Sequence, residues 1–189
     1  GQLSLTTFVP TDLETLTVTG VNAGLAATMS AAGQTFTVTN GLLGGQVSAI
    51  VMGAFAGTVT TGSAVDTITT ASTLNVVSTG AGNDVIKVVA ASDGASGAII
   101  NAGAGALDVI ELSENITGNT TYTLDATRIT GAEKLTILED AQGNIAVNLL
   151  TGMTTLATTD DAGSGTKTIT VTGTAAQLNA LTSTTFANT

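Results

Sequence analysis

The sequence predicts an all-β chain wound as a right-handed parallel β-helix or β-roll solenoid with irregular coils. Three observations favour this fold: an aliphatic residue recurs every nine positions, threonine, valine and glycine are abundant, and proline occurs once. Nine residues make one strand and one tight turn, and two such steps make one coil. The repeat is carried by Ile50, Val59, Ile68, Val77 and Ile86. The alternative is a β-sandwich of immunoglobulin type, with turns about every 8–12 residues.

The composition limits both the core and the partners. Hydrophobic residues make up 43% of the 189 residues but aromatic residues only 3%, so small and branched side chains must fill a narrow interior. Four basic residues against 14 acidic ones give a net charge of −10. This charge argues against nucleic acid and anionic membranes as partners, and no apolar run is long enough to insert into a membrane. Cysteine is absent, which fits a bacterial surface or secreted protein that uses metal instead of disulfides. Histidine is also absent, which removes the commonest general base and transition-metal ligand.

The first half of the chain reads as short strands. Segments 13–19 and 35–39 alternate apolar and polar residues, as half-buried strands do. Segment 23–32, between them, contains Ala, Leu and Met and predicts a loop or a short helical turn. Residues 47–93 hold the nine-residue repeat. We expect residues 1–189 to form a single solenoid-like fragment of a longer chain, with a weak seam near 113–120.

The second half of the chain is less regular. A turn at 93–97 breaks the repeat, and a short strand at 98–100 leads to a second glycine-rich turn that ends at Asp108. Segment 175–181 is the best helix candidate. Further strands are predicted at 121–124, 134–138, 145–149 and 168–172.

Polar residues accompany the repeat at a fixed offset. A carboxylate or amide stands two residues before the aliphatic position, or continues that series, at Asp66, Asn75, Asp84 and Asp93. Upstream, the same position is occupied by Ser48 and Gly57. A solenoid would stack these groups along its edge, and oxygen ligands of this kind are those that calcium binds.

The segment 79–87 resembles the glycine-rich nonapeptide of RTX proteins, G-G-x-G-x-D-x-U-x. Thr79 replaces the first glycine, and the remaining signature positions match. In that resemblance, glycines aim backbone carbonyls at Ca²⁺ and each ion lies between turns of successive coils. Asp66 and Asp84 are separated by two nine-residue steps, the one-coil spacing that this requires. The implied calcium ligands are Asp66, Gly80, Gly82, Asp84 and Asp108.

The longer stretch 80–137 resembles bacterial surface-layer proteins of the RTX type, such as the Caulobacter kind. The resemblance rests on the turn at 80–84, a second glycine-rich turn before Asp108-Val109-Ile110, and a closing strand at 129–137. It implies a secreted, cell-surface protein that needs Ca²⁺, leaves the cell without an N-terminal signal and self-assembles into a two-dimensional lattice. The alternative is a calcium-binding module of a large secreted RTX adhesin.

Nothing in the residues indicates an enzyme. A β-solenoid could host polysaccharide hydrolysis by paired carboxylates, or lysis, which usually needs a basic residue to take the proton. Sugar sites also favour Trp and Tyr, and this chain has one Tyr and no Trp. The candidate bases are Lys87, Arg128, Lys134 and Lys167. We therefore expect no catalytic site. The expected partners are further copies of the chain and a cell-surface polysaccharide.

Overall fold

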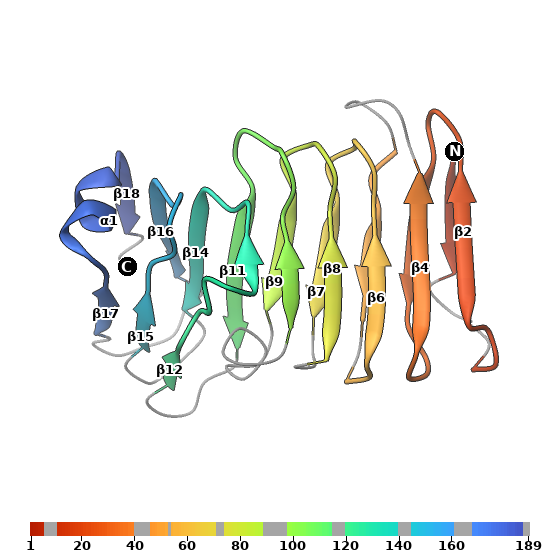
Figure 1. Cartoon of the computed structure of the whole chain (residues 1–189), viewed down its shortest axis with the longest axis horizontal. Helices are drawn as coiled ribbons and strands as arrows, with labels where there is room; N and C mark the ends of the chain where they lie inside the picture. The colour runs from red at the N-terminus through yellow and green to blue at the C-terminus, as the bar shows by residue number, and fades with distance from the viewer. Residues whose placement is uncertain are drawn as a thin grey trace.

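The computed structural model describes residues 1–5, 11–39, 46–52, 54–70, 74–88, 98–114, 120–139, 145–160 and 168–186. Within these ranges the chain is almost entirely β, and it winds along one axis as a β-solenoid. The N-terminus lies at one end of the stack of coils and the C-terminus at the other (Figure 1). The predicted parallel solenoid is therefore confirmed.

Three parallel sheets form the walls of the solenoid. Sheet A contains β1 (Gln2–Leu5), β3 (Gly24–Thr28), β5 (Ala49–Val51), β7 (Thr67–Thr70), β9 (Val85–Val88), β11 (Val109–Glu114), β14 (Lys134–Glu139), β16 (Thr155–Asp160) and β18 (Ser183–Phe186). Sheet B contains β2 (Thr15–Thr19), β4 (Gln34–Thr39), β6 (Gly57–Thr60), β8 (Asn75–Ser78), β10 (Ile99–Asn101) and β13 (Ile129–Thr130). Sheet C contains β12 (Thr120–Tyr122), β15 (Ile145–Asn148) and β17 (Ile169–Thr172).

All strand pairs in the described ranges are parallel, from β1 with β3 to β16 with β18. An immunoglobulin-type sandwich consists of antiparallel strands. That alternative is therefore wrong for this chain. Among the described helices, none is long and apolar enough to cross a membrane.

The nine-residue aliphatic series forms the centre of the core. Its members alternate between the two walls: Ile50, Ile68 and Ile86 stack in sheet A, while Val59 and Val77 stack in sheet B. Each of the five side chains is at most 1% exposed. Branched aliphatic side chains fit here because each lies directly above its equivalent in the next coil.

The coils differ in length, but their strands remain paired in register. Along sheet A, Ala49 pairs with Thr67 and Thr67 with Val85, so each of these two coils is made of two nine-residue steps. Val85 pairs with Val109 and Val109 with Lys134, so the next two coils are longer than two such steps. Extra residues therefore enter the connections, while the strands stay aligned.

One predicted element was wrong, and the predicted helix is confirmed. Part of segment 23–32, expected to be a loop or helical turn, is strand β3, which pairs with β1 and β5 and buries Leu25 and Ala27. Ladder hydrogen bonds on both sides override the helix preference of its Ala and Leu residues. The predicted helix is present as α1 (Ala175–Ala180), which begins with a capping box between Thr174 and Gln177.

The region of the predicted seam is partly described. Residues 115–119 lie outside the described ranges. Sheet A passes this point without interruption, because β11 pairs directly with β14. On the opposite wall, sheet B ends at β13 and sheet C begins at β12, so the change near 113–120 is confined to that wall.

Candidate metal centre

Asp66, Asp84 and Asp108 lie at the same place in successive coils. Each is the last residue of the turn that leads into sheet A, before β7, β9 and β11 respectively. All three residues are 0% exposed. The structure therefore brings together the three acidic residues that the sequence singled out. We call these three residues the carboxylate column.

Hydrogen bonds join the column from coil to coil. The backbone N–H of Asp66 donates to Oδ1 of Asp84 at 2.7 Å, and the N–H of Asp84 donates to Oδ1 of Asp108 at 2.8 Å. At the N-terminal end of the column, the N–H of Ser48 donates to Oδ1 of Asp66 at 2.5 Å. Each carboxylate thus satisfies a buried donor of the preceding coil, and such charge-assisted hydrogen bonds are strong.

Two further residues extend the column beyond the predicted set. The N–H of Asp108 donates to Oε2 of Glu133 at 2.8 Å, so a glutamate continues the pattern in the coil that follows Asp108. Glu133 stands two residues before buried Leu135, the same offset that separates Asp84 from Ile86, and this offset was the available sequence signal. At the other end, the hydroxyl oxygen of Ser48 accepts from the N–H of Leu25 at 3.4 Å.

The second carboxylate oxygens differ along the column. Oδ2 of Asp108 accepts from the N–H of Gly105 at 3.0 Å. Oδ2 of Asp66 and Oδ2 of Asp84 are buried and have no partner in good hydrogen-bond geometry among the described residues. The hydroxyls of Thr61 and Thr79 lie close enough to Asp66 and Asp84, respectively, to stabilise the two carboxylates weakly. Buried polar atoms without partners are rare and costly in native proteins. Two adjacent coils therefore each present one unsatisfied acidic oxygen inside the wall.

Burial disfavours the ionised form of the carboxylates in the column. Loss of solvent raises the pKa of Asp66 and of Asp108, against the opposing effect of their backbone hydrogen bonds. Burial likewise raises the pKa of Asp84 to about 6, and the neighbouring charges of Asp66 and Asp108 add to that effect. The hydrogen bond from the Asp66 N–H and the hydroxyl of Thr79 only partly offset it. A proton or a cation would relieve this electrostatic cost.

The predicted glycine ligands have a packing role of their own. The turn containing Gly80 lies against the turn of the preceding coil, where the N–H of Ala81 donates to the carbonyl of Gly62 at 3.0 Å. A Cβ at Gly80 would collide with that carbonyl oxygen, and a Cβ at Gly82, whose φ is +135°, would collide with the carbonyl oxygen of Ala64. Glycine is therefore required here by close backbone approach, whether or not the carbonyls bind a metal.

Asn75 does not join the carboxylate column. It begins β8 in sheet B, at the opposite corner of the coil, where its buried amide donates to the carbonyl of Phe55 at 2.6 Å. Gln34 occupies the equivalent position two coils earlier, through the register with Gly57. The nine-residue series therefore alternates between a carboxylate corner and an amide corner. Asp93 lies outside the described residues.

The column is stacked along the axis rather than gathered around one point. In the described part of the chain, no group of three or more His, Cys, Asp or Glu side chains is arranged to hold a metal ion. The unsatisfied oxygens of Asp66 and Asp84 nevertheless have the chemistry that Ca²⁺ prefers, since they are hard, charged oxygen donors. Asp108 fits less well, because both of its oxygens already accept backbone hydrogen bonds.

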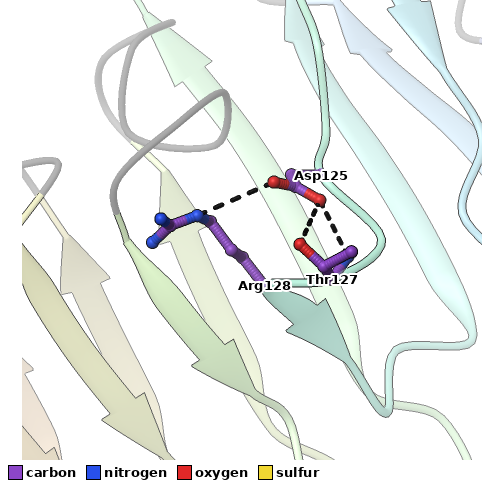
Figure 2. Close-up of polar contacts among 3 residues, drawn as sticks. All are labelled: Asp125, Thr127 and Arg128. Atoms are coloured by element: carbon purple, nitrogen blue, oxygen red, sulfur yellow. Dashed lines mark hydrogen bonds and ion pairs between the residues drawn. The ribbon is translucent and has the colours of Figure 1, made fainter.

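Some charged residues outside the column form local ion pairs. Lys87 and Glu111 meet at 3.0 Å across adjacent strands of sheet A. Arg128 lies 3.6 Å from Asp125, which also accepts from the N–H and the hydroxyl of Thr127 (Figure 2). These bonds from Thr127 lower the pKa of Asp125, with a smaller effect of Arg128. Two candidate bases thus have acidic partners, and Lys167 lies outside the described residues.

Comparison with known proteins adds no relative. No protein-family model, curated protein or solved structure matches this chain.

We expect Gly80→Ala to lower the free energy of unfolding by about 1–3 kcal/mol, because the new methyl group meets a backbone carbonyl that cannot rotate away. Gly20→Ala is the matched control, since its Cβ would meet only the Cβ of Ala23 at an ordinary 3.8 Å. Urea unfolding measures both values. Equal stabilities for the two variants would show that the turns do not stack as closely as described.

We expect the calcium-free chain to lose stability as the pH rises from about 4 to about 7. The folded pKa of Asp84 is about 6 against an ordinary 3.8, so the folded state binds the proton more tightly and is favoured at low pH. For Asp84 alone, the difference corresponds to about 3 kcal/mol at pH values above both.

The measurement is thermal melting in a chelator across this pH range. Asp84→Asn keeps an oxygen to accept from the Asp66 N–H but has no titratable group, so its profile should be much flatter. A variant profile parallel to that of the wild type would contradict the role given to Asp84.

Proposed function

We propose that this chain is a structural segment of a bacterial surface layer, stabilised by Ca²⁺ at the carboxylate column and built to self-assemble into a two-dimensional lattice. The observation that carries the proposal is the pair of buried, unsatisfied oxygens on Asp66 and Asp84 in adjacent coils. A divalent cation between these coils would satisfy both oxygens and offset the repulsion of the column.

The ligand set follows from which atoms are already engaged. Asp66 and Asp84 supply Oδ2, while their Oδ1 atoms continue to accept backbone hydrogen bonds. Asp108 contributes negative charge one coil away. The backbone carbonyls of Gly80 and Gly82, which belong to the same stack of turns, are the other ligands in this proposal. At pH values near or below 6, where Asp84 still holds much of its proton, binding of Ca²⁺ should release protons.

The fold supports a structural role. In a solenoid each coil contacts mainly its neighbours, so stability builds up along one axis and a stiff rod results. The net charge of −10 makes copies of the chain repel one another. Each bound Ca²⁺ lowers the magnitude of that charge by two, which favours association outside the cell where Ca²⁺ is available. Secretion and a position at the cell surface are part of this proposal.

We expect saturating Ca²⁺ to raise the melting temperature at pH 7.5 relative to a chelator. At a concentration 100 times the Kd, the stabilisation is about 2.7 kcal/mol. For a chain of this size, that corresponds to roughly 5–11 °C. Asp84→Asn should remove most of the rise, because it replaces a charged ligand by an amide.

Asp12→Asn is the control for a change of net charge, since Asp12 is exposed and lies outside the column. It should keep the full rise. Coincident melts of the wild type with Ca²⁺ and with chelator would overturn the calcium site. Electron microscopy of the wild type with Ca²⁺ tests the lattice: ordered arrays support a surface-layer protein, whereas a monomer that binds a ligand indicates an adhesin module.

A further inference from the structure

The outer face of sheet B is lined by threonine. Strands β2, β4 and β6 turn alternate residues inward, so the residues between them point out of the solenoid. The same alternation continues in β8, β10 and β13. We call these outward positions the threonine face, which consists of Thr15, Thr17, Thr19, Thr35, Thr37, Thr39, Thr58, Thr60, Val76, Ser78, Ile99, Asn101 and Thr130.

The strand register arranges this face as a grid. One row runs across neighbouring strands through Thr17, Thr37 and Thr60 and continues into Ser78. A parallel row begins at Thr15. Neighbouring members of a row are about 4.8 Å apart, and rows two residues apart along a strand are separated by roughly 6.6 Å. Threonine is branched at Cβ, which restricts its χ1 rotamers and therefore the positions open to its hydroxyl and methyl groups.

The threonine face carries no charged residue among the described positions. The outer face of sheet A differs, because Lys87 and Glu111 lie on it as a cross-strand pair. The chain as a whole carries a net charge of −10. The described outer face of sheet C is also uncharged, but it has three strands against the six of sheet B. The threonine face is therefore the wider of the two described sheet faces on which another copy of the acidic chain can approach without like charges meeting.

We propose that the threonine face docks a second copy of this chain, face to face, as one of the contacts of the lattice; this rests on the proposed function. Two sheets that pack together keep their strands nearly aligned. A second copy has the same inter-strand spacing, so rows of one face fit between rows of the other along the whole contact. A two-fold axis places the same patch on both partners.

The size of the face predicts how tightly the copies bind. Its six strands carry one to three outward residues each, thirteen in all. At about 4.8 Å by 6.6 Å for each position, they cover an area on the order of 400 Å². A stable dimer buries about 800 Å² per partner. The contact alone is therefore weak, and it becomes effective only where many copies are held together, as in a lattice.

The test introduces one positive charge on this face. Thr37→Lys places it between Thr17 and Thr60 while reducing the net charge from −10 to −9, so overall repulsion between copies falls. The matched control is Thr67→Lys, which changes a similarly half-buried, outward threonine on sheet A between Ala49 and Val85. Thr60→Lys serves as a second variant should Thr37→Lys melt at a lower temperature.

Sedimentation of the full chain in Ca²⁺ should show self-association that Thr37→Lys weakens about tenfold or more, because two desolvated charges then meet across the contact. Thr67→Lys should associate as the wild type does. Equal association of all three chains would overturn the inference. A wild type that stays monomeric would overturn it as well, even if a neutral polysaccharide retains the chain through this face.

Melting and microscopy of the same samples keep the two proposals apart. Calcium-stabilised arrays that form equally well from Thr37→Lys would overturn the threonine face and leave the surface-layer function standing. Dimers that are lost in Thr37→Lys but never become arrays would support the face and overturn the lattice function.

Discussion

The hydrogen bond from a turn N–H to the carboxylate of the next coil is the interaction on which the rest of this structure depends. It recurs from Ser48 to Asp66, from Asp66 to Asp84 and from Asp84 to Asp108, at the point where each coil enters sheet A. Because each acceptor belongs to the following coil, the bonds fix the stacking order and bury the carboxylates. The buried negative charge follows directly from this means of closing the turn.

The regular part of the solenoid could be predicted from the sequence, since a constant period fixes both which residues are buried and which stack. Asp66 and Asp84 were found in this way, because their coils have no insertion. Asp108 was placed only by its motif, since the coil between Val85 and its partner Val109 is longer than two nine-residue steps. Glu133 was missed because insertions changed the spacing again, and strand β3 was missed because its partners, rather than its own composition, decide its conformation.

The residues of the predicted site have different roles in the structure. Asp66 and Asp84 lie in one column, as the nine-residue period predicted, and Asp108 joins them although its coil is longer. The glycines are explained by backbone contact between turns, and Asn75 belongs to a separate amide corner with Gln34. In this account the charges of the chain have two separate roles. The buried ones join coils within a molecule, and the exposed ones keep molecules apart except across the neutral threonine face.

The most direct test of the central claim is the titration of the aspartate side-chain carboxyl carbons, followed by nuclear magnetic resonance in calcium-free protein and assigned with Asp84→Asn. The account predicts that the Asp84 resonance titrates with a midpoint near pH 6, as burial beside Asp66 and Asp108 requires, and that Ca²⁺ moves this midpoint down. A midpoint near 4 that Ca²⁺ does not change would contradict the account, because the carboxylate would then be neither buried in the column nor near a cation.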